Sequence, residues 1–305
     1  MFSIINGSTD VYLICGDPVE QVKAPEVFNL VFKRLGINAV LVPANVAAAD
    51  IEAFARTAFL ARNIKGLFLA IPHKALVMGM LSGCNDCGRV AGAVNGIRRN
   101  PDGTLEGGLF DGKGFVGALD YFSIAYAGRR VLVLGAGGGA AAIAASLAIA
   151  GEGAPAEISL YDPVAGKAGA VASHLRTAAM AKGVSINAAI SSDPSGYDIV
   201  VNASPLGLRS SDPLPCDVSR VAPHAAVVDI LMKNQPTPLL RAARARKLVA
   251  QPGFEMLIHQ VPDYLAFFGY PGAAETVRHD ATFVREYLYP AAMAGEIRRL
   301  QPQPA

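Results

Sequence analysis

The feature that most constrains the fold is a short apolar run followed directly by a cluster of glycines and an alanine-rich segment. The run is Val131–Leu134, and after it come Gly135, Gly137, Gly138, Gly139 and Ala140. The whole uncharged stretch Val131–Gly151 has the length of a membrane-spanning helix. Consecutive glycines, however, are typical of a turn and not of a helix interior. The stretch therefore predicts a strand, a tight turn and a helix.

The same alternation of strand-like runs and amphipathic segments continues through most of the chain. Strands are expected at Val11–Cys15, Ala39–Val42, Gly66–Ile71, Val131–Leu134, Ile158–Tyr161, Ser185–Ala189, Ile199–Asn202, Ala226–Leu231 and Leu248–Ala250. Helices with apolar residues at three- and four-residue spacing are expected at Pro25–Leu35 and Ala48–Ala61. Runs that are apolar throughout indicate strands buried on both faces. Their alternation with helices predicts an α/β fold with mostly parallel sheets.

Two breaks in this pattern predict two domains. Glycines crowd the stretch 95–117, and Asn100-Pro101-Asp102-Gly103 has the composition of a β-turn. We expect a β-hairpin there, leading into the second domain. From Phe254 onward the sequence reads as helices without a strand, and we expect these helices to return to the first domain. A chain of 305 residues fits this division, since one domain takes roughly 100–200 residues.

The glycine cluster has the spacing of a dinucleotide-binding turn. Gly135-x-Gly137-x-x-Ala140 after a strand matches the pattern in which small residues let a pyrophosphate approach the backbone. The start of the following helix offers N–H groups to the phosphates. Asp162, at the end of the next strand, fits the acid that accepts ribose hydroxyls and repels a 2′-phosphate. We therefore expect NAD, with NADP less favoured. The alternative is a structural glycine turn without a nucleotide.

Composition narrows the classes of protein that fit. With 52% hydrophobic residues the chain is not mostly disordered. Lys+Arg 27 against Asp+Glu 25, with no basic block, argues against nucleic-acid and membrane partners. The pair Cys84 and Cys87 has C-x-x-C spacing, but no second pair or nearby histidine completes a zinc site, so no metal is expected. The N-terminal residues lack the features of a signal peptide, and we expect a cytoplasmic location.

Further motifs occur in an order that resembles the shikimate dehydrogenase family between about Val11 and Phe268. They are Gly16-Asp17-Pro18, Lys23-Ala24-Pro25, Ile71-Pro72-His73-Lys74, Ala91-Gly92-Ala93-Val94-Asn95, Phe110-Asp111-Gly112, Val201-Asn202-Ala203-Ser204-Pro205-Leu206-Gly207, Thr237-Pro238-Leu239-Leu240 and Met256-Leu257…Gln260. The resemblance implies an N-terminal α/β substrate domain at 1–110 plus 254–305, and a Rossmann NAD(P)-binding domain at 111–253. It also implies a site between them and hydride transfer between nicotinamide and a cyclic hydroxy acid or ketone.

The resemblance implies a catalytic pair. Lys74 matches the lysine of the family's V-P-x-K turn, and Asp111 matches the second aspartate of its D-N-T-D-G segment. A positioned lysine can exchange the proton that accompanies hydride transfer, and a neighbouring carboxylate tunes its protonation. The alternatives are an exposed loop lysine and an aspartate that caps the next helix. His73, beside the lysine, is a further candidate for proton transfer, although a structural or solvent-facing role is the simpler interpretation.

The resemblance also implies binding residues. Asn95 and Gln260 match family residues that contact substrate, although an asparagine in a turn and a glutamine on a helix are both ordinary. The positions implied near the cofactor, besides the glycine turn and its acid, are Asn202, Ser204, Leu206, Met232, Gly253 and Met256. Met256 is also suited to filling a core.

The chain departs from the family where substrate oxygens are held. The family's polar substrate contacts are replaced by Val22, Ala24, Phe68, Ala70, Leu109 and Phe110, and the tyrosine of its D-x-x-Y segment by Met232. A buried hydroxyl without a partner costs about 1–3 kcal/mol. We therefore expect weak use of shikimate and a less polar substrate. Lys23 and His73 are candidates for a replacement carboxylate partner.

Three functions remain open from the sequence. The first is an NAD-dependent dehydrogenase of this type with an altered substrate. The second is a genuine shikimate or quinate dehydrogenase whose carboxylate site is rebuilt. The third is a nucleotide-binding sensor without activity, against which the retention of both Lys74 and Asp111 argues. The expected partner is a small-molecule substrate, and the expected assembly is a monomer or homodimer.

Overall fold

The computed structural model describes residues 5–179, 183–209 and 211–293, and the chain divides into two compact units. The first unit contains the chain up to Phe110 and Ile258–Leu288, and the second contains Asp111–Leu257 and the chain from Tyr289. The sequence predicts that everything after residue 253 belongs to the first domain. Residues 254–257 and 289–293 instead group with the second unit, and residues 294–305 lie outside the described part.

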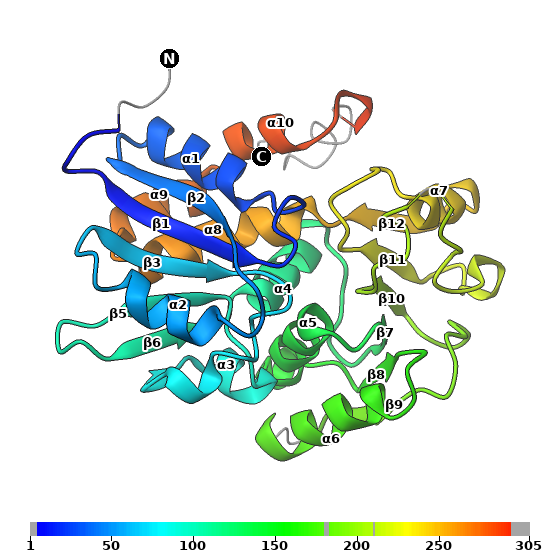
Figure 1. Cartoon of the computed structure of the whole chain (residues 1–305). Coiled ribbons are helices and arrows are strands. Elements are labelled where there is room, and N and C mark those ends of the chain that lie inside the picture. Colours follow the sequence, from blue (N-terminus) through cyan, green and yellow to red (C-terminus); the bar gives the residue numbers. More distant parts are fainter. Residues whose placement is uncertain (1–4, 180–182, 210, 294–305) are drawn as a thin grey trace. The chain divides into compact units, whose positions relative to one another are not determined.

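The first unit is built on a mixed sheet (Figure 1). Its strands are β1 (Asp10–Gly16), β2 (Ala39–Asn45), β3 (Ile64–Leu69), β4 (Gly83–Cys84), β5 (Gly96–Arg99) and β6 (Leu105–Gly108), in the order β2-β1-β3-β5-β6-β4. β1 pairs in parallel with β2 and β3, whereas β5 pairs antiparallel with β3 and β6. The predicted hairpin is therefore confirmed as β5–β6. The short strand β4 has no counterpart in the sequence prediction.

The two faces of this sheet have different cores. The helical elements are α1 (Ala24–Arg34), α2 (Ile51–Ala58), η1 (Met78–Met80), α3 (Asp86–Ala91), α8 (Phe254–Phe267), α9 (Pro271–His279) and α10 (Thr282–Leu288). Leu67 and Leu69 pack into an aliphatic cluster with residues of α2 and η1. Phe68 points to the other face, because side chains alternate along a strand. There its ring contacts Phe28 of α1 and Tyr264 of α8.

Glycines in the sheet make room for the aromatic face. A Cβ at Gly66 would overlap the ring of Phe268, and one at Gly108 would overlap the ring of Phe110. At Gly96 it would lie 3.1 Å from the ring of Tyr264. Rings therefore lie directly on the backbone of three strands, which sets how closely α8 approaches the sheet.

The second unit is a six-stranded, fully parallel sheet. Its strands are β7 (Arg130–Leu134), β8 (Glu157–Tyr161), β9 (Ser185–Ala188), β10 (Ile199–Asn202), β11 (Ala226–Asp229) and β12 (Val249–Pro252). The spatial order β12-β11-β10-β7-β8-β9 is the Rossmann order 3-2-1-4-5-6 read from the other edge. The order reverses between β7 and β10, and ligands of such sheets bind at this switch point.

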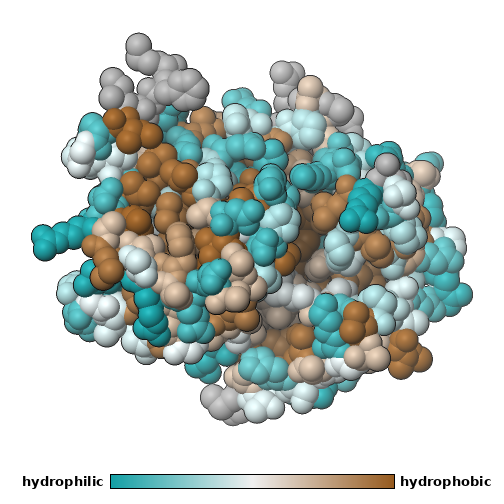
Figure 2. Space-filling view, viewed as in Figure 1, coloured by the Kyte–Doolittle hydropathy of each residue, from teal (hydrophilic) through white to brown (hydrophobic). Residues whose placement is uncertain are grey.

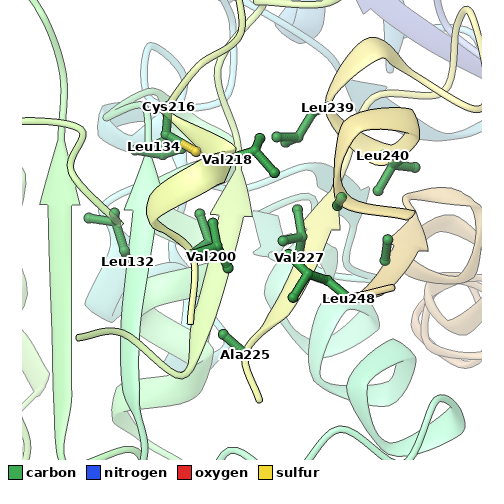
Figure 3. Packing of buried hydrophobic residues seen from close by; sticks show 13 residues of the cluster. Leu132, Leu134, Val200, Cys216, Val218, Ala225, Val227, Leu239, Leu240 and Leu248 are labelled. Carbon is green, nitrogen blue, oxygen red and sulfur yellow. The ribbon is translucent and has the colours of Figure 1, made fainter. Parts of the chain in front are cut away.

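Helices cover this sheet, and its central strands β7, β10 and β11 are buried on both faces as predicted. The edge strand β9 differs, because only Ile186 of its four residues is buried. The elements are α4 (Asp111–Tyr121), α5 (Gly138–Ala148), η2 (Gly151–Gly153), α6 (Lys167–Ala179), η3 (Val218–Arg220), α7 (Pro238–Ala245) and η4 (Ala291–Met293). Figure 3 shows one core cluster, in which Leu132, Val200 and Val227 of three strands meet Leu239 and Leu240 of α7. The stretch that resembled a membrane span is β7, the glycine turn and α5.

The predicted strands and helices are present, and their ends differ by a few residues. The strand expected at Ala226–Leu231 ends at Asp229, because the carboxylate of Asp229 accepts the backbone N–H of Leu231 and turns the chain. The strand expected at Gly66–Ile71 runs instead over Ile64–Leu69. The helix expected at Ala48–Ala61 is shorter, Ile51–Ala58.

In the described residues, no helix combines the length and apolarity needed to cross a membrane. On the face shown in Figure 2, hydrophilic and hydrophobic residues are interspersed. Such mixing is usual, because apolar atoms supply more than half of most protein surfaces.

The packing of α4 on α5 gives a test of the second unit. A Cβ at Gly112 would overlap the carbonyl oxygen of Ala142 and the hydroxyl of Ser146. We expect Gly112→Ala to lower the free energy of unfolding by about 3 kcal/mol, since overpacking costs roughly 1–3 kcal/mol and backbone cannot yield easily. Gly169→Ala is the control, because a Cβ at this helical position would meet no described atom within 4 Å.

Urea unfolding of both variants is the measurement. The control should match or exceed the wild type, since alanine is favoured over glycine inside a helix by about 0.5–1 kcal/mol. Equal stability of Gly112→Ala and Gly169→Ala would contradict the close contact between the two helices.

Candidate functional site

The glycine turn of the second unit lies at the switch point of its sheet. Gly135 has φ +113°, and a Cβ there would lie 2.8 Å from the carbonyl oxygen of Ala203. Gly137 is the N-cap of α5 and is exposed, and a Cβ on it would meet no described atom within 4 Å. Ala140 is fully buried at the start of the helix. The turn thus has a strained residue that only glycine suits, an open backbone and a closely packed helix, as a pyrophosphate site requires.

Asp162 follows β8 and reaches back to the glycine turn. Its Oδ2 accepts the N–H of Ala136 at 2.9 Å, and its Oδ1 accepts the N–H of Val164 at 3.0 Å. Lys167, at the start of α6, places its Nζ 3.1 Å from the same Oδ2. Burial raises the pKa of Asp162, but the hydrogen bonds from Val164, Lys167 and Ala136 outweigh it, so that the pKa lies below its usual value. The carboxylate is therefore ionised at neutral pH.

The loop after β10 is built around Asn202. This buried amide ends the strand, and its Oδ1 accepts both the N–H and the hydroxyl of Ser204, at 3.1 and 2.7 Å. Its Nδ2 donates to the carbonyl of Leu206 at 3.0 Å. The three residues predicted near the cofactor are thus held together in one loop. The side-chain amide of Asn202 is bonded to its own loop, so Asn202 shapes this loop.

The other residues predicted near the cofactor have structural surroundings of their own. A Cβ at Gly253 would lie 2.5 Å from the backbone of Ile230, so that a side chain there would displace the loop after β11. Met256 is buried on α8, and Met232 is half-buried after β11. Gly139 is the second residue of α5 and lies beside Ile230, whose Cδ1 would lie 3.5 Å from an added Cβ.

In the first unit, Lys74 lies in the turn between β3 and η1. The backbone carbonyl of Lys74 accepts the N–H of Val94 at 2.9 Å, which fixes the turn beside Asn95. The neighbouring turn after β1 is joined to it, because Asp17 donates its N–H to the carbonyl of Ile71 at 3.0 Å. The half-buried Lys74 therefore lies in a turn close to the carboxyl ends of β1 and β3.

His73 is fully buried, with an exposed fraction of 0%, so the solvent-facing interpretation is wrong. Neither ring nitrogen makes a hydrogen bond of normal geometry to the described part of the chain. Burial lowers the pKa of His73, and the carbonyls of Val46 and Gly16 and the charge of Asp17 offset this only in part. The ring is therefore neutral at physiological pH, as a structural histidine would be.

Asn95 is bonded to the segment after β6 and to helix α8. Its Oδ1 accepts the N–H of Phe110 at 3.0 Å, and its Nδ2 lies 3.4 Å from Oε1 of Gln260. Its backbone carbonyl accepts the hydroxyl of Tyr264 at 2.8 Å. The structure thus brings the two predicted substrate residues together. It adds Tyr264, which the sequence analysis missed although it lies one helical turn after Gln260.

The apolar replacements fall into two groups. Phe68, Leu109 and Phe110 are buried, and the ring of Phe68 stacks on Tyr264 with centroids 4.3 Å apart. Their apolar character is explained by packing between the sheet and α8. Val22, Ala24 and Ala70 are half-buried; Val22 and Ala70 lie in the segments after β1 and β3, and Ala24 is the first residue of α1. Contact of either group with substrate stays a prediction.

Lys23 does not offer an unengaged charge to a substrate carboxylate. Its Nζ lies 2.9 and 3.0 Å from the two carboxylate oxygens of Glu26. With His73 buried and neutral, neither candidate for a replacement carboxylate partner is favoured by its surroundings.

Asp111 is the first residue of α4 and is largely buried. It belongs to the second unit, whereas Lys74 belongs to the first. Their action as a pair therefore stays a prediction. Within the described residues, no group of three or more His, Cys, Asp or Glu is arranged to hold a metal ion. No disulfide joins the four cysteines, all of which are described; Cys84 ends β4 and Cys87 lies in α3.

Two further residues near the dinucleotide turn were not singled out from the sequence. Lys167 pairs with the predicted ribose acid, and the signal was a basic residue five positions after it at the start of a helix. Asp229 is fully buried and bonded to Asn202. Burial raises the pKa of Asp229 to about 6, against the lowering effect of Thr237, Leu231 and Asn202. The polar residue at the end of an otherwise apolar strand was the available signal.

Comparison with known proteins agrees with this arrangement. Residues 14–97 match the family described as the shikimate dehydrogenase substrate binding domain. The chain is 35% identical over 257 residues to a protein of Rubrobacter xylanophilus named shikimate dehydrogenase (NADP(+)), covering 84% of this chain and 89% of that protein.

Two solved structures are similar over most of their length. One is the ligand-free 5-ketofructose reductase of Gluconobacter sp. strain CHM43, with 25% identity, a TM-score of 0.76 and coverage of 90% of this chain and 99% of that one. The other is quinate dehydrogenase from Corynebacterium glutamicum in complex with NAD, with 25% identity, a TM-score of 0.75 and coverage of 88% and 98%. Sequence and fold together show that the chain belongs to the shikimate dehydrogenase family.

Proposed function

We propose that the protein is an NAD-dependent oxidoreductase that transfers hydride between nicotinamide and a cyclic hydroxy acid or ketone. The observation that carries the proposal is the glycine turn at the switch point of a Rossmann-ordered sheet, with Asp162 bonded to it at 2.9 Å. The open backbone at Gly137 and the start of α5 fit a pyrophosphate. The loop of Asn202, Ser204 and Leu206 lies on the same edge of the sheet and fits the rest of the dinucleotide.

The chemistry needs a proton as well as a hydride. A nicotinamide bound in the second unit would supply the hydride to the carbonyl carbon of a ketone, or accept it from the carbinol carbon of the alcohol. Lys74 donates the proton to the forming alkoxide when a ketone is reduced, and accepts it from the hydroxyl in the opposite direction. The carboxylate of Asp111 is the second member of the proposed acid–base pair. Asn95 and Gln260 orient the substrate through amide groups already placed beside each other.

The substrate is proposed to be less polar than shikimate. Val22, Ala24 and Ala70 carry this proposal, because they are the replacements that stay half-buried at the edge of the first unit. Without hydroxyl side chains there, a hydroxyl-rich ring loses hydrogen bonds worth about 1–3 kcal/mol each where the partner is left buried. The likeness to 5-ketofructose reductase supports a substrate other than shikimate on this fold.

A genuine shikimate or quinate dehydrogenase is the second candidate. The relative from Rubrobacter xylanophilus is named as a shikimate dehydrogenase, and one similar structure is a quinate dehydrogenase. A sensor without activity is disfavoured, because it would need neither Lys74 nor Asp111.

Steady-state oxidation of shikimate, quinate and less polar cyclic alcohols separates these functions. We expect kcat/KM for shikimate to lie at least tenfold below that for the best substrate. The double variant Val22→Ser, Ala24→Ser should raise kcat/KM for shikimate by restoring hydroxyl partners. Shikimate as the best substrate of the unmodified protein would overturn the altered substrate, and no turnover with any alcohol would favour the sensor.

The acid–base assignment predicts large losses of turnover. Lys74→Ala and Asp111→Ala should each lower kcat by roughly 10²-fold or more, the scale of general acid–base catalysis. NAD affinity should change little, since neither residue belongs to the glycine turn. Lys65→Ala and Asp120→Ala, at exposed positions of β3 and α4, are the matched controls. Near wild-type turnover of Lys74→Ala would move the proton transfer to another group.

The cofactor preference is tested by opposite charges beside the adenosine ribose position. We expect kcat/KM to favour NAD over NADP by about tenfold or more, because the ionised Asp162 repels a 2′-phosphate. Asp162→Ala should narrow the preference. Lys167→Ala should widen it, since it removes the ammonium 3.1 Å from Asp162 that would otherwise attract the phosphate. The relative from Rubrobacter xylanophilus is named for NADP(+), so equal use of both cofactors or a preference for NADP would refute the role of Asp162.

A further inference from the structure

Asp229 is a buried carboxylate that the proposed chemistry does not use. It is the last residue of β11, and its exposed fraction is 0%. Its Oδ2 accepts the hydroxyl of Thr237 at 2.6 Å, and its Oδ1 accepts Nδ2 of Asn202 at 3.1 Å and the N–H of Leu231 at 3.2 Å. Burying a carboxylate costs free energy unless it is hydrogen-bonded. The three neutral donors therefore stabilise the buried Asp229, and Asp229 in turn fixes the positions of Thr237, Asn202 and Leu231.

The bond to Asn202 decides how the loop after β10 is folded. The Nδ2 of Asn202 donates one N–H to Asp229 and the other to the carbonyl of Leu206. The Oδ1 of Asn202 therefore faces Ser204. The hydroxyl of Ser204 in turn accepts the N–H of Leu206 at 3.2 Å. Because an ionised carboxylate can only accept, it fixes which end of the Asn202 amide faces it.

This loop rests directly on the glycine turn. A Cβ at Gly135 would lie 2.8 Å from the carbonyl oxygen of Ala203 and 3.0 Å from the nitrogen of Ser204. The backbones of the two loops are therefore in contact, and the position of Ser204 sets the space beside the turn. A shift at Asn202 is transmitted to the turn without any intervening side chain.

Asp229 also holds the chain that follows its own strand. Thr237 is the N-cap of α7, and its hydroxyl accepts the N–H of Leu240 at 3.3 Å while donating to Asp229. Between Asp229 and Thr237 lies Ile230, whose side chain faces Gly139. One carboxylate thus joins the loops after β10 and β11, and each of them contacts the glycine turn or the start of α5.

We propose that Asp229 is a positioning residue for the dinucleotide: through Asn202 and Thr237 it fixes the loops at 203–207 and 230–237 against the glycine turn. The inference rests on the proposed function for the identity of the ligand, and on the described contacts for the positioning itself. Asp229 touches neither the substrate nor the reacting atoms in this assignment.

The test compares two changes that break the network with two that do not. Asp229→Asn keeps the shape but replaces one acceptor by a donor, so that the donors of Asn202, Leu231 and Thr237 can no longer all be accepted. Thr237→Val removes the hydroxyl at nearly constant volume. Thr237→Ser restores the hydroxyl, and Asp217→Asn makes the same carboxylate-to-amide change at an exposed cap of η3.

Hydrogen–deuterium exchange without cofactor measures the positioning, and titration with NADH measures its effect on binding. We expect exchange at 203–207 to rise at least tenfold in Asp229→Asn and Thr237→Val, and Kd for NADH to rise about tenfold. Thr237→Ser and Asp217→Asn should resemble the wild type in both. If Asp229→Asn does not fold, Thr237→Val and its serine rescue carry the same comparison.

The outcomes separate the inference from the proposed function. Exchange and Kd unchanged in both network variants would overturn the inference while NADH binding stands. A lower Tm with unchanged Kd would reduce Asp229 to a purely structural role and also overturn it. A wild-type protein that binds neither NADH nor NADPH would overturn the proposed function and the cofactor role of Asp229 together, and the exchange data would still decide whether Asp229 fixes the loop.

Discussion

The contact between Gly135 and the backbone of Ala203 and Ser204 links the two strands at which the order of the parallel sheet reverses. Only a residue without a Cβ permits this approach at φ +113°. Because the loops after β7 and β10 touch there, the glycine turn and the Asn202 loop form one surface at the carboxyl edge. Asp162 bonds to this surface through Ala136, and Asp229 bonds to it through Asn202.

The first unit depends on a different constraint, the stacking of aromatic rings on glycines of the sheet. Tyr264 lies on Gly96 and stacks on Phe68, while its hydroxyl bonds to the carbonyl of Asn95. This packing fixes α8, and with it the side chain of Gln260 beside Asn95. This packing also gives a structural reason for phenylalanine at positions 68 and 110, where the family has polar residues. Both rings fill the space between the sheet and α8. Their effect on the substrate would then be indirect, through the polar groups that they replace.

Both units have a buried asparagine that holds the chain where it leaves regular structure. Asn95 joins the segment that follows β6 to α8, and Asn202 joins the loop beside the glycine turn to Asp229. An amide offers both donors and acceptors, so one side chain can satisfy several backbone groups that leave regular structure at a strand end. Asn95 and Asn202, which the sequence suggests as ligand contacts, therefore use their amides in hydrogen bonds within the protein.

Most of the strands and helices follow from the sequence alone, because continuous apolar runs, glycine spacing and helical periodicity are local properties. The sequence determined the glycine turn and its acid for the same reason, and the order of motifs indicated the family. It did not determine that Phe68 faces Tyr264, which lies 196 positions later, or that Asp229 reaches Asn202, which lies 27 positions earlier. These contacts depend on which strands become neighbours, and strand order is fixed by packing of the whole sheet. The same physics moved residues 254–257 to the second unit, since Gly253 lies against Ile230 and holds the start of α8 there.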